Sequence, residues 1–218
     1  MKNSFGKDSI IYLITEGVAT AENFPETSRR ILGIIRAAAR AEINFVQIRE
    51  KKLSAKLVFE LAARAAKLTR NTNTKILIND RADIALAARA GGVQLTAQSL
   101  SAKIIRQNFP KNFIVGVSAH TLCEAERAKM QGANFALFSP IFKTPSKEND
   151  GAPQGLEKLR EVCEKLKPFP VLALGGVNET NFKQVLENGA SGFAAIRFLN
   201  ELFLRGNAED FKKFRNER

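Results

Sequence analysis

The stretch Asn134-Phe-Ala-Leu-Phe138 is followed by Ser139-Pro-Ile-Phe-Lys-Thr-Pro-Ser-Lys-Glu-Asn-Asp-Gly-Ala-Pro-Gln-Gly155 and then by Leu156-Glu-Lys-Leu-Arg-Glu-Val-Cys-Glu-Lys-Leu166. The first run is short and apolar, as in a buried strand, and the last has the apolar spacing of a helix. The connection exceeds the roughly two to six residues of most strand-to-helix loops. Thr144, Ser146 and Lys147 supply hydroxyls and a cation, which are groups that bind phosphate. The stretch therefore predicts a binding loop, with a plain solvated loop as the alternative.

The same alternation of strand and helix runs through the whole chain. The apolar pattern predicts strands at residues 10–15, 45–48, 75–78, 92–95, 113–117, 134–138, 170–174 and 192–196. It predicts helices at residues 29–42, 54–70, 82–90, 100–108, 121–131, 156–166, 178–188 and 198–205. Such alternation requires a parallel sheet, and this number of units predicts an α/β fold of the (β/α)8 TIM-barrel type. An open doubly wound sheet is the alternative, but residues 15–18 contain no GxGxxG phosphate loop.

The domain organisation is predicted to be simple. Residues 1–218 form one domain, and the charged tail at 207–218 is expected to fray. Residues 16–28 are predicted to be a polar loop, and Ser54 and Asn178 are predicted helix N-caps. Cys123 and Cys163 form no disulfide framework, so both are expected to be reduced packing residues.

The formal charge of +12, from 34 Lys and Arg against 22 Asp and Glu, favours anionic partners. The positive residues are spread along the chain, and there is no Trp and one Tyr for base stacking. Phosphorylated small molecules are therefore the expected partners, and nucleic acid is not. No apolar run is long enough to span a membrane, and no signal-peptide core is present, so a cytoplasmic protein without a membrane partner is expected. A homo-oligomer is left open.

Candidate site residues follow the predicted strands, because a (β/α)8 barrel builds its site at the carboxyl ends of its strands. Gln47, Arg49 and Lys51 alternate, which places two cations on one side of an extended segment and predicts an anion site. A solvated strand end is the alternative. Gly176 permits close approach of the backbone to a ligand, unless Gly175-Gly176 is only a turn.

Two further residues each have two interpretations. Asp80 can hold Mg2+ through one oxygen while phosphates supply others, or it can cap the helix that follows. His120 can act as an acid or base near neutral pH, or it can cap or pack at a helix start.

Five motifs in order together resemble the thiamine phosphate synthase/TenI family. They are Gln47-Ile-Arg49-Glu-Lys51, Ile78-Asn-Asp-Arg81, Gly116-Val-Ser-Ala-His120, Thr144-Pro-Ser-Lys147 and Leu174-Gly-Gly-Val177. The resemblance runs from about Tyr12 to Ile196 and implies a (β/α)8 fold. Synthases of the family join hydroxymethylpyrimidine diphosphate to a thiazole phosphate and release pyrophosphate, as a step of thiamine biosynthesis.

The resemblance also implies roles for individual residues. The pyrimidine diphosphate would be bound by Gln47, Ile48, Arg49, Glu50, Lys51, Asn79, Ser118 and Lys147. The thiazole phosphate would be bound by Thr144, Pro145, Ser146, Gly176, Ile196 and Arg197. Asp80 would hold Mg2+. The catalytic set would be Arg49, Lys51, Lys147 and His120.

Departures from the family pattern keep two other functions open. Synthases usually read Gly-Val-His-Leu-Gly-Gln-x-Asp-Leu where this chain has Gly92-Val-Gln-Leu-Thr-Ala-Gln-Ser-Leu100. The second Mg2+ aspartate is thus Ser99, and the family's serine after the last strand is Arg197. One alternative is a TenI-like tautomerase, which would use His120 without metal on a thiazole carboxylate phosphate. The other is a non-catalytic relative that binds a phosphate ligand.

Overall fold

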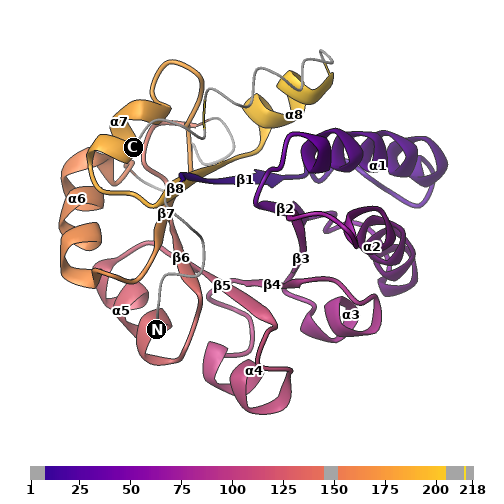
Figure 1. The fold of residues 1–218 in the computed structure, drawn as a ribbon, viewed down its shortest axis with the longest axis horizontal. Coiled ribbons are helices and arrows are strands. Elements are labelled where there is room, and N and C mark those ends of the chain that lie inside the picture. The colour runs from indigo at the N-terminus through magenta and orange to yellow at the C-terminus, as the bar shows by residue number, and fades with distance from the viewer. Residues whose placement is uncertain (1–7, 145–151, 205–213, 215–218) are drawn as a thin grey trace.

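The fold is a closed barrel of eight parallel strands that pair in chain order, with the helices in a ring outside (Figure 1). The computed structural model describes residues 8–144, 152–204 and 214. The strands are β1 (Ile10–Ile14), β2 (Phe45–Ile48), β3 (Lys75–Asn79), β4 (Gly92–Leu95), β5 (Ile114–Ala119), β6 (Phe135–Phe138), β7 (Val171–Ala173) and β8 (Gly192–Ala195). The helices are α1 (Phe24–Arg40), α2 (Ala55–Thr69), α3 (Ala82–Ala87), α4 (Ala102–Asn108), α5 (Leu122–Met130), α6 (Gly155–Leu166), α7 (Phe182–Glu187) and α8 (Arg197–Leu204). The predicted (β/α)8 fold is confirmed.

The strands are continuous apolar runs because both of their faces are buried, as expected for a parallel sheet covered by helices. The outward face packs against the helices in one large core. The inward face forms a smaller core within the barrel, made of Ile10, Tyr12, Ile14, Phe45, Leu77, Phe135, Leu137, Leu172 and Ala194. Three rings fill its centre, with the centroid of Tyr12 5.6 Å from Phe45 and 5.8 Å from Phe135. The barrel is therefore solid below its carboxyl rim.

Helix α1 is the main departure from the prediction, since it begins at Phe24 rather than at residue 29. Pro25 lies in its first turn, where the missing N–H costs no hydrogen bond and the fixed φ suits a helix. Thr27 and Ser28 are polar but buried in this helix, and their polar character led to the prediction of a loop. The loop prediction for residues 16–28 was therefore wrong for residues 24–28.

Two predicted N-caps have different outcomes. The Ser54 hydroxyl accepts a hydrogen bond from the Leu57 N–H at 3.4 Å, which confirms it as the cap of α2. Asn178 is not the cap of α7, which begins at Phe182 after Asn181. The Asn178 side chain instead accepts from the Thr180 N–H at 2.8 Å, so it shapes the turn before the helix.

The two cysteines and the end of the chain differ from the prediction in part. Cys163 is buried in the core as expected, whereas Cys123 is exposed, so the packing interpretation was wrong for Cys123. The expected fraying of residues 207–218 lies outside the described residues except at Phe214, which is fully buried. Its ring contacts those of Phe182, Phe193 and Phe198. Within the described ranges, every helix is too short or too polar to cross a membrane.

Candidate active site

Five polar side chains from five strands form a hydrogen-bonded layer at the carboxyl side of the barrel interior. Gln47 Nε2 donates to Asn79 Oδ1 at 3.0 Å, and Gln94 Nε2 donates to Ser118 Oγ at 3.2 Å. The Tyr12 hydroxyl joins the two pairs, at 3.3 Å from Gln47 Oε1 and 3.2 Å from Gln94 Oε1. The structure therefore brings together Gln47, Asn79 and Ser118, which the sequence predicted as ligands of one substrate. We call these five residues the amide layer.

The strands position the amide layer through their register and through one missing side chain. Gln94 pairs with Gly116 in the β4–β5 register. A Cβ atom at Gly116 would lie 2.4 Å from both Gln94 Oε1 and the Phe135 ring, so only glycine leaves room for the Gln94 amide. Burial raises the pKa of Tyr12 well above its ordinary value of 10.0. The phenol thus stays a neutral donor, and its single proton serves one of the two amide oxygens at a time.

Two cations continue from the amide layer along the segment that follows β2. The Arg49 side chain is partly exposed and Lys51 is exposed. The Arg49 N–H donates to Thr15 Oγ1 at 2.9 Å, which fixes the backbone at this point. Among the described residues, neither cation forms an ion pair. Cations without acidic partners beside buried hydrogen-bonding groups make a site that suits an anionic ligand.

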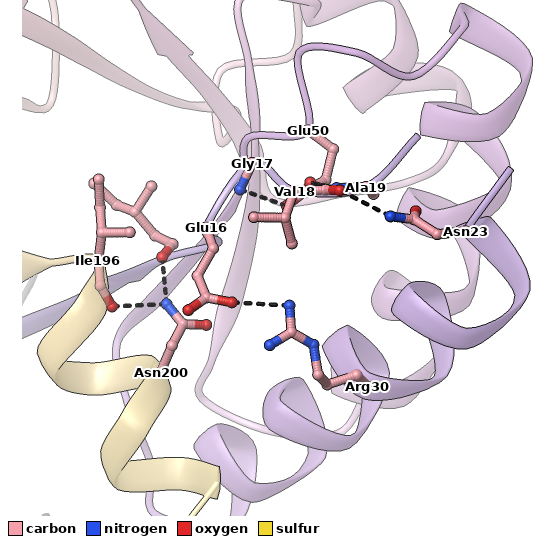
Figure 2. A network of polar contacts seen from close by, with 10 residues as sticks. Glu16, Gly17, Val18, Ala19, Asn23, Arg30, Glu50, Ile196 and Asn200 are labelled. Atoms are coloured by element: carbon pink, nitrogen blue, oxygen red, sulfur yellow. Dashed lines mark hydrogen bonds and ion pairs between the residues drawn. The ribbon is translucent and has the colours of Figure 1, made fainter. Parts of the chain in front are cut away.

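Ile48 and Glu50 alternate with these residues and turn to the other side of the segment. Ile48 is 1% exposed and packs in the core beneath the helices. The Glu50 carboxylate is buried and accepts from the Gly17 N–H at 3.1 Å and the Ala19 N–H at 2.8 Å (Figure 2). Their side chains are therefore occupied within the protein. The assignment of both residues to substrate binding stays a prediction, and it now rests on their backbone groups.

Asp80 lies just beyond β3 in a left-handed conformation with φ of 62°. Its N–H donates to the Gln94 carbonyl at 2.9 Å and its side chain is exposed. The alternative interpretation as a helix cap was wrong, because α3 begins after Arg81. The left-handed backbone turns the chain sharply between β3 and α3 while leaving the Asp80 carboxylate on the surface.

The surroundings of Asp80 decide what kind of metal site is feasible. Ser99, at the family's second aspartate position, uses its hydroxyl to accept from the Thr96 N–H at 2.8 Å. The Asp83 carboxylate is paired with Arg81 at 2.6 Å, and this contact lowers its pKa. Over the ranges described, no three His, Cys, Asp or Glu side chains form a metal-binding group. One carboxylate fits Mg2+ only where substrate phosphates and water complete the coordination, which is a usual arrangement for this ion.

His120 follows β5 and has a defined tautomer. Its Nδ1 lies 2.7 Å from the Ser139 carbonyl oxygen. Because a carbonyl only accepts hydrogen bonds, Nδ1 carries the hydrogen, and Nε2 of the neutral ring keeps a lone pair. The His120 N–H also donates to Glu124 Oε2 at 2.6 Å, at the start of α5. The residue thus holds the helix start and retains one nitrogen that can take a proton.

After β7 the carboxyl rim includes two glycines whose backbone lies close to the segment that follows β6. Gly175 and Gly176 have φ of 97° and 69°. The Phe142 N–H donates to the Gly175 carbonyl at 2.9 Å. A Cβ atom at Gly176 would lie 2.7 Å from both the Lys143 carbonyl oxygen and Phe142 Cβ. Glycine is therefore required here for the chain's own loop, and its approach to a ligand stays a prediction.

The long loop after β6 is closed at its base. The Gln154 N–H donates to the Pro140 carbonyl at 2.7 Å, and the Gly155 N–H donates to the Ile141 carbonyl at 3.1 Å. Thr144 is partly buried near this base. Pro145, Ser146 and Lys147 lie outside the described residues, so their predicted roles, and the predicted proximity of Lys147 to Arg49, stay predictions.

The β8–α8 junction completes the rim. Ile196 packs against the interior core, and Arg197 is the exposed first residue of α8. Asn200 is buried and its Nδ2 donates to the Ile14 carbonyl at 2.8 Å and the Ile196 carbonyl at 2.7 Å (Figure 2). This amide joins the end of β1 to the start of α8. The exposure of Arg197 leaves its guanidinium available at the position where the sequence predicted a phosphate contact.

Sequence reasoning missed three members of the site. Tyr12 was counted only as part of an apolar strand, Gln94 only as a departure from a family motif, and Thr15 only as the end of the first strand. A usable signal existed for Tyr12, because it is the single tyrosine of the chain and lies two residues from Ile10 and Ile14 on the inward face. No such signal marked Gln94, whose role depends on the empty space at Gly116.

These features define a single (β/α)8 barrel with a candidate site on its carboxyl rim. The candidate site has hydrogen-bonding side chains inside the barrel and, after β2, two cations that form no ion pair with a described residue. Residues 11–199 match the family model described as thiamine monophosphate synthase, and the chain belongs to this family. It is 41% identical to a relative from Aquifex aeolicus over 191 residues, covering 88% of this chain and 97% of the relative. It is 36% identical to the thiamine-phosphate synthase of Methanocella arvoryzae, covering 85% of this chain and 84% of that protein.

A solved structure agrees with the sequence relatives. The barrel superposes on the thiamine phosphate pyrophosphorylase of Pyrococcus furiosus with a TM-score of 0.73 and 28% identity. The match covers 93% of this chain and 96% of that one. The likeness therefore spans the whole barrel, including the strands that carry the amide layer.

Proposed function

We propose that this protein is a thiamine phosphate synthase, a transferase that joins hydroxymethylpyrimidine diphosphate to a thiazole phosphate with release of pyrophosphate. The observation that carries the proposal is the amide layer, which gathers Gln47, Asn79 and Ser118. The cations Arg49 and Lys51 lie on the segment that follows β2 and form no ion pair with a described residue. Amide and hydroxyl groups match the hydrogen-bonding edge of an aminopyrimidine, and the cations match its diphosphate. Membership of the family supports the same assignment.

The chemistry needs charge neutralisation and orientation more than acid–base groups. Diphosphate leaves the pyrimidine methylene carbon, and the resulting cation is stabilised by the aminopyrimidine ring. The thiazole nitrogen then forms the new C–N bond. Arg49 and Lys51, with Lys147 as predicted, would bind the departing negative charge, while Gln47, Asn79 and Ser118 would hold the ring in line. Phosphorylated pyrimidine and thiazole compounds are thus the proposed partners, in the cytoplasm.

Mg2+ is part of the proposal in a limited form. Asp80 would hold the ion together with oxygen atoms of the diphosphate and water, because Ser99 and Asp83 are engaged elsewhere. When bound, the ion would neutralise charge on the leaving diphosphate. Binding of Mg2+ should therefore depend on the diphosphate, since the protein offers a single carboxylate.

The direct test is synthesis of thiamine phosphate from the two substrates with Mg2+. Product should form with the unmodified protein and should be lost with Asp80→Ala. Asp83→Asn is the matched control, because it removes a neighbouring exposed carboxylate whose pair with Arg81 contributes little to stability. Equal loss in both variants, or product formation by Asp80→Ala, would contradict the assigned role of Asp80.

A second candidate function, a TenI-like tautomerase, is supported by His120. Its Nε2 keeps a lone pair, as a proton-transfer group requires. This function predicts isomerisation of the thiazole carboxylate phosphate without Mg2+, and loss of that activity in His120→Ala. Absence of isomerisation in a preparation that makes thiamine phosphate would exclude it. Failure of both assays, with a phosphate ligand still raising the melting temperature, would support the non-catalytic relative.

A further inference from the structure

Glu50 is an acidic residue placed among cations without pairing with any of them. Arg49 and Lys51 flank it in sequence, yet no ion pair joins Glu50 to a described residue. The side chain is 4% exposed, so its charge must be satisfied within the protein. Both carboxylate oxygens are in fact used, one by the Gly17 N–H at 3.1 Å and the other by the Ala19 N–H at 2.8 Å.

The two N–H groups belong to the loop between β1 and α1, which we call the first rim loop and define as residues 15–23. The loop has its own internal contacts, since Asn23 Oδ1 accepts from the Thr20 N–H at 2.8 Å and Asn23 Nδ2 donates to the Val18 carbonyl at 3.1 Å. Figure 2 shows Glu50 at Gly17 and Ala19, with Asn23 bonded to Val18 between them. Glu50 therefore fixes an already ordered loop against the end of β2.

The first rim loop in turn touches Arg49. Thr15 Oγ1 accepts from the Arg49 N–H at 2.9 Å. Gly17 has φ of 78°, and a Cβ atom there would lie 3.2 Å from the Arg49 carbonyl and 3.6 Å from its guanidinium Nη1. The guanidinium thus lies beside the Gly17 backbone. A loop that moved away from β2 would remove this support from Arg49.

We propose that Glu50 is a positioning residue, which acts on the substrate diphosphate only through Arg49. Its carboxylate holds the first rim loop against β2, and the loop holds the Arg49 guanidinium in place on the rim. Because each carboxylate oxygen is directed to a backbone N–H of the loop and not to the guanidinium, Glu50 leaves the Arg49 donors for the anion. This inference rests on the proposed function for its kinetic consequences, although the contacts themselves are independent of it.

The test begins with Glu50→Gln, which keeps the shape but presents an amide NH2 to one of the two N–H donors. The KM for the pyrimidine diphosphate should rise about tenfold, since hydrogen bonds to a charged group are lost. The KM for the thiazole phosphate should stay unchanged within error. Glu50→Asp keeps the charge on a shorter side chain and should recover part of the loss. A merely structural role would instead lower the melting temperature and leave both KM values unchanged, which would overturn the proposal.

A matched control and a double variant separate Glu50 from general loop damage. Glu16 is on the same loop as Gly17 and Ala19, and Glu16→Gln breaks its 2.8 Å ion pair with Arg30 of α1. Arg49 takes no part in this pair, so neither KM should change. If Glu50 acts through Arg49, adding Glu50→Gln to Arg49→Ala should cause no further rise in the KM for the pyrimidine diphosphate. Additive effects of the two substitutions would overturn the proposal.

A binding experiment keeps the inference separate from the proposed function. Inorganic pyrophosphate should raise the melting temperature of the unmodified protein, less so for Arg49→Ala and Glu50→Gln, and equally for Glu16→Gln. If the unmodified protein makes no thiamine phosphate, the proposed synthase function fails while this result still decides the role of Glu50. Equal stabilisation of Glu50→Gln and the unmodified protein by pyrophosphate would refute the positioning role.

Discussion

The two halves of the carboxyl rim are built from different parts of the chain. From β1 to β5 the candidate site consists of side chains, namely the amide layer with Arg49, Lys51 and Asp80 after the strand ends, and we call this part the side-chain half. From β6 to β8 the described interior side chains are apolar, including Leu137 and Leu172, and the backbone packs closely at Gly175 and Gly176, so we call this part the backbone half. Figure 1 shows the two sets of strands facing each other across the barrel.

This difference indicates two modes of recognition. A side-chain half can read the hydrogen-bonding pattern of a ring and balance a diphosphate, because amides and cations differ in what they donate and accept. In the backbone half the close contacts at Gly175 and Gly176 involve backbone N–H and carbonyl groups, so the local geometry depends on the path of the chain. Substitutions should therefore affect chemistry in the first half and chain path in the second.

The largest expected effect is loss of activity in Arg49→Ala. Removing one group that stabilises the departing charge should lower kcat/KM roughly 10²–10³-fold, while the melting temperature stays near that of the parent. Steady-state assays of thiamine phosphate formation check this. Arg36→Ala removes an exposed arginine from α1 and serves as the control. A similar loss in both variants would show that total charge, rather than position, matters.

The next effect is on stability, from Gly176→Ala. A left-handed conformation costs a side chain about 1–2 kcal/mol, and the clash with Phe142 and Lys143 adds to it. The free energy of unfolding, measured with urea, should fall by about 2–3 kcal/mol, and the KM for the thiazole phosphate should rise more than that for the pyrimidine.

Gly33→Ala is the control for that variant, because no atom lies within 4 Å of the added Cβ in the middle of α1. It should raise the free energy of unfolding by about 0.5–1 kcal/mol. If Gly176→Ala proved equally harmless, the backbone half would not depend on a close approach of the loop, and the contrast between the two halves would weaken.

A smaller effect is expected from Tyr12→Phe, which removes the hydroxyl between Gln47 and Gln94. Their amide oxygens would lose a buried donor, which costs about 1–3 kcal/mol of the free energy of unfolding. Urea denaturation measures this cost. The KM for the pyrimidine diphosphate should rise with it, because the amide layer holds that ring in our proposal. A stability loss without any change in KM would limit the amide layer to a structural role.

The smallest effect at neutral pH, and a distinct one at high pH, comes from the ionisation of Tyr12. Its pKa is raised in the folded state, so the stability it contributes is complete below its ordinary pKa of 10.0 and is lost as pH rises above it. Cys163 behaves alike, with its pKa raised by burial from 9.0 to about 12. The free energy of unfolding should therefore fall as the pH rises above about 10. In Tyr12→Phe this decrease should be smaller than in the unmodified protein, by about 1.4 kcal/mol per pH unit.

Tyrosinate absorbance provides a direct measurement, because Tyr12 is the single tyrosine and the chain has no tryptophan. The absorbance should appear together with unfolding rather than before it. Titration of Tyr12 near pH 10.0 in the folded protein would contradict its burial in the amide layer.

Residue patterning alone predicted the order of strands and helices, and with it the barrel. Strands buried on both faces are continuous apolar runs that are easily recognised, and the alternation of strands and helices admits few topologies. It also placed Gln47, Arg49, Asn79, Asp80 and Ser118 at strand ends, since the chain position of a strand end is local information. The start of α1 was missed because buried Thr27 and Ser28 look like loop residues until their neighbours are known.

How those residues are used depends on contacts that form only in the folded barrel. Glu50 belongs to the same motif as Arg49 and Lys51, yet it bonds to Gly17 and Ala19 more than thirty positions earlier. Gln94 enters the amide layer because Gly116 of the next strand has no side chain. Gly176 is required by Phe142 and Lys143 of another loop. Each contact joins segments far apart in sequence, and closing the barrel is what brings them within hydrogen-bonding or van der Waals distance.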